Sequence, residues 1–302
     1  MFVFPGQKSF SIGEIRFGGQ LNNPCVLVGT IFYRKEGLFT GSNGVFDRKK
    51  AQDLIKASEG FSDETGIPCM LDVYGDSPEF ICDRIDFVSE VSDRPFFIDS
   101  TDAKVRIAGV EHAEEVGLCD RLAYNSINVG TGVEELAVLA GSSVSAAILL
   151  AFNPLSNSLE GKLKVLDEGV GNLKKGLIET ASDCGISRVL VDTGITPLGE
   201  GASSAVRAIP CVKAKYGLPS GCGIHNAVIE WRWIKGREEL FVDAASNVLA
   251  RTLGADFILY GPIERARNVF STVAFVESLF GEASEEFGLD VSDTHPSRLL
   301  LK

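Results

Sequence analysis

An eightfold alternation of short apolar segments with longer amphipathic segments limits the fold of this chain more than any other feature of its sequence. The apolar segments are rich in Val, Ile, Leu and Phe, as strands are, and the amphipathic segments place apolar residues three and four positions apart, as helices do. Strands that alternate with helices predict a parallel sheet covered by helices. The predicted strands are 24–31, 68–73, 95–98, 121–124, 146–152, 188–192, 220–224 and 256–260.

Several helix boundaries can be predicted from local signals. Asp47 is suited to cap a helix that runs to about Thr65, because its side chain can accept a hydrogen bond from a free backbone N–H. A second start lies at 77–79, where Ser-Pro-Glu combines a cap, a proline at the first helical position and an early acid. The longest helix is predicted over about 160–184 and the last over about 262–281.

Eight strand–helix units favour closure into a (β/α)8 TIM barrel, a fold that commonly takes about 250 residues. The alternative is an open doubly wound sheet, which would favour a Gly-x-Gly-x-x-Gly turn after the first strand, whereas residues 29–31 are Gly-Thr-Ile. No low-complexity linker interrupts the pattern. We therefore predict one domain over residues 1–302, with a hairpin at about 1–23 and a C-terminal tail at about 282–302.

The balance of charge and the distribution of cysteine restrict the class of protein. The formal net charge of −12 argues against a nucleic-acid partner, which requires a basic surface to neutralise phosphates. The apolar runs are too short for a transmembrane helix, and the first residues lack the charged start and apolar core of a signal peptide. The seven cysteines are scattered and include no Cys-x-x-Cys pair, which predicts free thiols in a reducing cytoplasm.

Polar side chains directly follow four of the predicted strands. Asp99, Asn125 and Asp192 end three of them, and a fourth ends at His225 and Asn226. The carboxyl ends of barrel strands form the active site in barrel enzymes. A carboxylate accepts two parallel hydrogen bonds and an amide offers donors and an acceptor, so these residue types suit a heteroaromatic ring with several N–H groups. One such residue is as readily a turn or helix cap, but four together favour a site.

Two further motifs admit both a structural and a functional interpretation. Cys222 and His225 have the spacing of half a zinc site, but no second pair is evident, so a buried strand thiol is the favoured interpretation. His225 either lines the predicted pocket or orients Asn226. The Gly-rich residues 199–201 could serve a phosphate at a helix N-terminus, although we favour a tight turn against the ligand.

Long ordered strings in the sequence closely resemble one protein family. They are FGGQ (17–20), GTIFY (29–33), SDETG (62–66), FFIDST (96–101), YNSIN (124–128), TPLGEGASSAVRA (196–208), VKAKYG (212–217), GCGIHN (221–226) and LYGPIE (259–264). They are similar to the H subunit of tetrahydromethanopterin S-methyltransferase and to soluble relatives that move methyl groups between a corrinoid and tetrahydrofolate. The resemblance extends from Phe17 to about Gly281. It implies a (β/α)8 fold related to the pterin-binding barrels of dihydropteroate synthase and the methyltetrahydrofolate:corrinoid methyltransferases.

The resemblance also implies roles for individual residues. Asp99, Asn125 and Asp192 are expected to hold the ring of a reduced pterin, either tetrahydromethanopterin or tetrahydrofolate. Asn226 corresponds to an asparagine that hydrogen-bonds near N5 of the ring in the related methyltransferases. The predicted pterin-binding set is completed by Ser126 and His225, and the predicted catalytic residues are Asn226, Asp192 and Asp99. No metal ligand is predicted.

The implied reaction moves a methyl group between N5 of the pterin and the cobalt of a corrinoid. No Asp-x-His-x-x-Gly corrinoid motif occurs in the chain, so the corrinoid, a cobalamin, is expected on a partner protein that docks at the barrel mouth. The family's soluble members pair their barrels, which implies a homodimer, and association with a membrane methyltransferase complex is compatible with the resemblance.

Two other functions are alternatives. One is a non-catalytic pterin-binding or docking subunit of a larger methyltransferase complex. The other is a dihydropteroate-synthase-like enzyme, which would require a basic anion pocket at the last strand. Residues 260–264, Tyr-Gly-Pro-Ile-Glu, carry an acid there and no Arg-His pair, which counts against that alternative.

Overall fold

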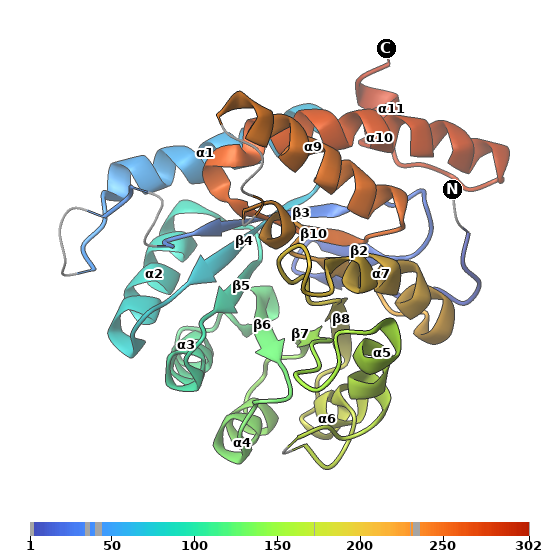
Figure 1. Cartoon of the computed structure of the whole chain (residues 1–302). Helices are drawn as coiled ribbons and strands as arrows, with labels where there is room; N and C mark the ends of the chain where they lie inside the picture. Colours follow the sequence, from blue (N-terminus) through green and yellow to red (C-terminus); the bar gives the residue numbers. More distant parts are fainter. Residues whose placement is uncertain are drawn as a thin grey trace.

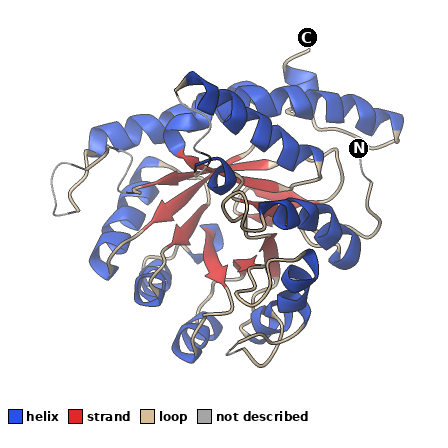
Figure 2. Ribbon diagram, in the orientation of Figure 1, coloured by secondary structure: helices blue, strands red, loops and turns tan. Residues whose placement is uncertain are grey.

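Eight parallel strands close into a barrel in this computed structural model, which describes residues 3–33, 37–39, 44–171, 173–229, 231 and 236–301. The strands follow the order β10-β3-β4-β5-β6-β7-β8-β9 around the barrel, so each crossover helix lies outside the strand pair that it connects (Figure 1). Figure 2 shows the strands gathered inside a ring of helices. The predicted barrel is confirmed, and the open doubly wound sheet is excluded.

The observed strands coincide with the eight predicted segments to within a few residues. They are β3 Val26–Ile31, β4 Cys69–Tyr74, β5 Phe96–Asp99, β6 Leu122–Ile127, β7 Ala146–Leu150, β8 Arg188–Asp192, β9 Ser220–Cys222 and β10 Phe257–Pro262. The helices are α1 Arg48–Thr65, α2 Pro78–Val91, α3 Ala103–Glu115, α4 Val133–Gly141, α5 Leu159–Asp167, α6 Leu177–Asp183, α7 Ala202–Tyr216, α8 His225–Ile229, α9 Arg237–Thr252, α10 Ala266–Glu286 and α11 Pro296–Leu299. None of the helices described is long and apolar enough to cross a membrane.

The local capping signals are confirmed where the sequence predicted them. The Asp47 side chain accepts a hydrogen bond from the Lys50 backbone N–H, and Gly66 ends α1 in the left-handed conformation. The Ser77 side chain accepts from the Phe80 N–H at the start of α2, with Pro78 as the first helical residue. These caps satisfy backbone groups that a helix end would otherwise leave unpaired.

The predicted helix over 160–184 is wrong, because α5 and α6 are separate helices joined by a loop. The loop contains glycines that the fold requires. A Cβ atom on Gly169 would clash with the Leu173 carbonyl oxygen, and a Cβ on Gly176 would clash with that of Leu166. The apolar spacing continued across the break, so periodicity alone did not reveal it.

The last long helix also differs from its prediction. Gly281 does not end α10, which continues to Glu286. A Cβ on Gly281 would clash with the Ser297 side chain, so this glycine allows α11 to pack closely on α10. The predicted tail from about 282 therefore begins inside a helix, and its last residue, Lys302, lies outside the described residues.

A hairpin of β1 Ser9–Ile12 and β2 Ile15–Gly18 covers the amino end of the barrel. Ile12, Ile15 and Phe17 are buried and belong to the cluster that fills the barrel interior, together with Phe97 and Phe257. The first two residues of the predicted hairpin segment, 1–2, lie outside the described part of the chain. With the amino end filled by apolar side chains, the carboxyl ends of the strands form the other end of the barrel.

Two buried ion pairs join helices to the strands β3, β9 and β10. The Arg251 Nε lies 2.7 Å from the Glu277 Oε1, which also accepts from the Cys25 N–H just before β3. The Lys213 Nζ lies 2.6 Å from both carboxylate oxygens of Asp256, and the Oδ2 also accepts from the Ser220 N–H in β9. Each charge is buried but paired, which is the condition for burying a charge without a large loss of stability.

We predict that Glu277→Ala lowers the free energy of unfolding by about 3–5 kcal/mol, because it leaves the Arg251 guanidinium buried without its carboxylate partner. Denaturant unfolding followed by circular dichroism measures this change. The exposed pair Lys49–Asp53 supplies the control, since Asp53→Ala should cost only about 0.3–0.5 kcal/mol. If both substitutions lower the free energy of unfolding by the same small amount, the Arg251–Glu277 pair does not have the predicted role in stability.

Candidate functional site

The polar residues predicted at strand ends gather at the carboxyl end of the barrel. Asp99 is the last residue of β5 and stands beside Asn125 of β6 in the sheet register. Asp192 is the last residue of β8, and its register partner in β9 is Gly221. Asn226 follows β9 in the short helix α8. Residues as far apart in the chain as Asp99 and Asn226 therefore lie at the same mouth of the barrel.

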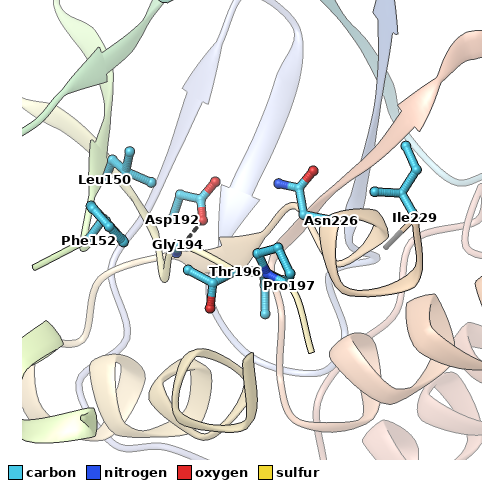
Figure 3. Close-up of a pocket in the computed structure, with 9 residues that line it drawn as sticks. Leu150, Phe152, Asp192, Gly194, Thr196, Pro197, Asn226 and Ile229 are labelled. Carbon is cyan, nitrogen blue, oxygen red and sulfur yellow. Dashed lines mark hydrogen bonds between the residues drawn. The ribbon is translucent and has the colours of Figure 1, made fainter. Parts of the chain in front are cut away.

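A cavity of about 410 Å³ opens at this mouth. Asp192 and Asn226 are its polar side chains with the largest hydrogen-bonding capacity, and Figure 3 shows both directed into the same space. Apolar side chains form much of the rest of the wall. The described lining residues are Leu150, Phe152, Asp192, Gly194, Ile195, Thr196, Pro197, Asn226 and Ile229. Apolar walls with a few polar groups are typical of a small-molecule site.

Asp192 is held by the turn that follows β8. Its Oδ1 accepts a hydrogen bond of 2.7 Å from the Gly194 N–H, while Figure 3 shows the second oxygen directed toward the cavity. Burial raises the pKa of Asp192 to about 6, and the Gly194 N–H and the Lys162 ammonium act in the opposite direction. The carboxylate therefore combines a fixed position with a second oxygen that accepts no hydrogen bond from the described residues.

Lys162 is a site-forming residue that sequence reasoning missed. It projects from α5, is buried, and its Nζ donates to the carbonyl oxygens of Thr193 and Gly194 at 2.9 and 2.8 Å. These bonds fix the turn that carries Asp192. A signal was present, because Lys162 stands three residues before Val165 on the buried face of the helix, where a lysine requires partners.

Asp99 has a similar support from the helix that follows it. Arg106 of α3 is buried, pairs with Glu135 at 2.6 Å and donates to the carbonyl oxygen of Ser100. Burial raises the pKa of Asp99 well above its usual range, the Asp72 carboxylate raises it further, and Arg106 lowers it. Asp99 is thus repelled by the neighbouring carboxylates of Asp72 and Asp192, and a ligand that donates several hydrogen bonds would offset this repulsion.

Asp72, within β4, is the second residue that sequence reasoning left out of the site. Its Oδ1 accepts from the Asn125 Nδ2 at 3.1 Å, and its Oδ2 accepts from the Thr30 Oγ1 at 3.0 Å. Burial raises its pKa to about 6, while these two hydrogen bonds lower it. The available signal was an acid inside the otherwise apolar strand Cys69–Tyr74, because an isolated buried carboxylate requires a partner.

Ser126 and His225 lie beside the mouth. Ser126 is buried, and its Oγ lies 3.5 Å from the Asn128 Nδ2. The His225 ring packs against Gly261 of β10, and its Nδ1 lies 3.1 Å from the Leu259 carbonyl oxygen. Neither residue is among those that line the cavity in the described part of the chain, and neither are Asp99 and Asn125, so of the predicted pterin-binding residues Asp192 and Asn226 line it. The contact of His225 with β10 anchors the start of α8, in which Asn226 is the next residue.

The described residues contain no group of three or more His, Cys, Asp or Glu side chains arranged to hold a metal ion. Cys222, the other half of the Cys-x-x-His motif, is fully buried in β9, and burial raises the pKa of its thiol well above the usual range. A buried, protonated thiol is a poor metal ligand.

Exposed apolar side chains occur on several segments that follow the strand ends. They come from segments that follow β3, β6, β7, β8 and β9, so they belong to the same end of the barrel as the cavity. We call this set the apolar rim, and it consists of Tyr33, Val133, Leu155, Leu198, Ile229, Trp231 and Phe241. A group of exposed large apolar residues around one site is typical of an interaction surface.

Comparison with known proteins identifies the chain's relatives. The profile of the family described as "Tetrahydromethanopterin S-methyltransferase MtrH subunit" matches residues 6–292. The H subunit of tetrahydromethanopterin S-methyltransferase from Methanothermobacter marburgensis is 43% identical, over 100% of both chains. The H subunit of the putative methyltransferase mtx from Methanosarcina barkeri is 39% identical, again over 100% of both chains.

Solved structures support the fold. Dihydropteroate synthase of Yersinia pestis, in a complex with a sulfonamide drug, superposes with a TM-score of 0.63 at 13% identity, covering 93% of this chain and 100% of that one. The Thermus thermophilus enzyme gives 0.61 at 13% identity, covering 90% and 100%. At such low identity the likeness concerns the barrel itself. The sequence matches are decisive for the family: this chain belongs to the MtrH family, that of the H subunit of tetrahydromethanopterin S-methyltransferase.

Proposed function

We propose that this protein transfers a methyl group between N5 of a reduced pterin and the cobalt of a corrinoid carried by a partner protein. The observation that carries the proposal is the convergence of Asp99, Asn125 and Asp192 at the barrel mouth, beside an apolar-walled cavity. The names of the relatives, as methyltransferase subunits, support the type of reaction. Tetrahydromethanopterin is the pterin in those names, and tetrahydrofolate is the alternative.

The electrostatics of the mouth suit a pterin. The aminopyrimidinone edge of that ring carries several N–H donors, and carboxylates are strong acceptors for such groups. Asp99 and Asp192 supply carboxylates whose pKa values are raised by burial, so N–H donors would compensate charge that the protein leaves poorly solvated. Leu150, Phe152 and Ile229 offer apolar surface for the faces of a flat ring.

Asn226 is the residue that we propose acts on the chemical step. It is exposed, lines the cavity and faces the same space as Asp192 (Figure 3). When the methyl–N5 bond breaks, its electron pair remains on N5, which makes the pterin amine a poor leaving group. An amide cannot give up a proton at neutral pH, but it can hydrogen-bond N5 or a water there as charge develops.

The apolar rim is the proposed docking surface for the corrinoid-carrying partner, which supplies the nucleophile. It includes Ile229, which lines the cavity, and Trp231 and Phe241, aromatic residues of the kind enriched at protein interfaces. A partner seated on this rim would cover the cavity and exclude water from the reacting groups.

A homodimer is the second proposed assembly. Helices α9 and α10 pack side by side and expose Leu249, Phe275 and Leu279. This apolar surface lies on the outside of the barrel, on helices rather than on the mouth loops, so pairing there would leave the mouth open to the corrinoid protein (Figure 1).

For pterin binding we predict that Asp192→Ala weakens affinity roughly ten- to a hundredfold, because it removes a charge-assisted acceptor worth about 1.5–3 kcal/mol. In the wild type, affinity should also fall as the pH drops below about 6, since protonation of Asp192 removes the same acceptor. The affinity of the variant should depend less on pH than that of the wild type. Calorimetric titration with the methyl-pterins across pH 5–8 measures both; unchanged affinity would refute the assignment.

For the chemical step we predict that Asn226→Ala lowers single-turnover methyl transfer to cob(I)alamin by about 10²–10³-fold and leaves most of the pterin affinity. A contact that strengthens only in the transition state acts on the rate rather than on binding. Near-native transfer by the pterin-saturated variant would make Asn226 only a wall of the cavity. A wild-type protein that binds methyl-pterin and transfers nothing would favour the non-catalytic docking subunit.

For the assembly we predict a dimer in sedimentation velocity at micromolar concentration, and a monomer for Phe275→Asp, which places a charge on the exposed face of α10. Val116→Asp is the matched control, since Val116 is also exposed but lies at the end of α3, away from α9 and α10. A wild-type monomer at this concentration is the result that rejects the homodimer.

A further inference from the structure

We infer that Asp72 is a positioning residue that orients the Asn125 side-chain amide, so that Asn125 presents its carbonyl oxygen to the ligand. The inference rests on the proposed function, because the ligand in question is the reduced pterin. It deepens that function because the orientation of the Asn125 amide decides whether Asn125 offers the ligand a hydrogen-bond acceptor or a donor.

The geometry joins three strands at the mouth. Asp72 of β4 accepts from the Asn125 Nδ2 of β6 at 3.1 Å and from the Thr30 Oγ1 of β3 at 3.0 Å. Asp72 is only 3% exposed, whereas Asn125 is partly exposed. Both carboxylate oxygens of Asp72 are thus used within the protein, and the partly exposed members of the network are its two hydrogen-bond donors, Asn125 and Thr30.

The chemistry of the two groups fixes the amide. An ionised carboxylate has only acceptors, so the group of Asn125 that can satisfy it is the NH2. The Thr30 hydroxyl, bonded to the other oxygen, holds the plane of the carboxylate. With its Nδ2 committed to Asp72, Asn125 turns its Oδ1 away from the carboxylate.

The consequence is a mouth that presents acceptors. Asp99 and Asp192 are carboxylates, and an amide oriented by Asp72 adds a third acceptor, Oδ1. Such a site selects a heterocycle with several N–H donors and disfavours one that offers an acceptor to Asn125, because two facing acceptors leave both unpaired. Without Asp72, the amide could rotate by half a turn and present a donor instead.

A double-mutant cycle tests whether Asp72 acts through Asn125. The affinities of wild type, Asp72→Ala, Asn125→Ala and the double variant are measured by calorimetry with 5-methyltetrahydrofolate and with methyl-tetrahydromethanopterin. We expect about tenfold weaker binding for Asp72→Ala and roughly ten- to a hundredfold for Asn125→Ala. The double variant should bind as weakly as Asn125→Ala alone, because Asp72 has nothing to orient once the amide is gone.

Glu114→Ala is the matched control. Glu114 also accepts hydrogen bonds from a neighbouring segment, at Ser143, but it lies at the end of α3 away from the mouth, so pterin affinity should not change. Circular dichroism and a cooperative thermal transition establish that each variant is folded. If Asp72→Ala does not fold, Thr30→Val replaces it in the cycle, with a smaller loss that likewise disappears in the Asn125→Ala background.

Two outcomes overturn the inference. One is wild-type affinity in folded Asp72→Ala, and the other is a double variant whose loss is the product of the two single losses, which would make the residues independent. A wild-type protein that binds neither methyl-pterin rejects the proposed function and this inference together. If the wild type binds a methyl-pterin and the double variant loses affinity by the product of the two single losses, only the inference about Asp72 is rejected.

Discussion

Three buried cations hold the turns on which the candidate site is built. Arg84 donates to the Tyr74 carbonyl oxygen at 2.8 Å, Arg106 donates to that of Ser100, and Lys162 donates to those of Thr193 and Gly194. Each carbonyl lies at or just beyond the end of a strand that carries a site acid. A buried cation is costly unless it is paired or hydrogen-bonded, so these contacts favour the observed conformation of each turn. The acids are therefore carried by rigid strand ends rather than by free loops.

The same arrangement explains the charge balance of the mouth. Arg106 lowers the pKa of Asp99 and Lys162 lowers that of Asp192, but burial outweighs both and the net shifts are upward. Asp72 is stabilised by neutral partners, Thr30 and Asn125. Three acids at one mouth with too little compensating positive charge form a site that gains from a ligand rich in N–H groups. The cations support the backbone more than they neutralise the site.

The amino end of the barrel contains packing and ion-pair contacts that stabilise the fold, whereas the carboxyl end contains the candidate site. At the amino end, the hairpin fills the opening with apolar side chains, and the pairs Arg251–Glu277 and Lys213–Asp256 join helices to the strands β3, β9 and β10. At the carboxyl end, the cavity, the acids and the apolar rim lie together. This division is usual in barrel enzymes, where one end stabilises and the other reacts. It also separates the proposed dimer surface, on the outer helices, from the surface proposed for the corrinoid partner.

The sequence by itself determined the eight strands, the barrel, the caps at Asp47 and Ser77, and the polar strand ends Asp99, Asn125 and Asp192. These follow from local patterns of burial, capping and strand termination. Only the structure decided that the segment with Gly169 and Gly176 breaks a predicted helix, because its backbone folds back on itself between Glu168 and Lys175, which apolar spacing does not reveal. The same holds for Asp72 and Lys162. Their partners lie 53 and 31 residues away in the chain, at Asn125 and Thr193, and only barrel closure brings them together.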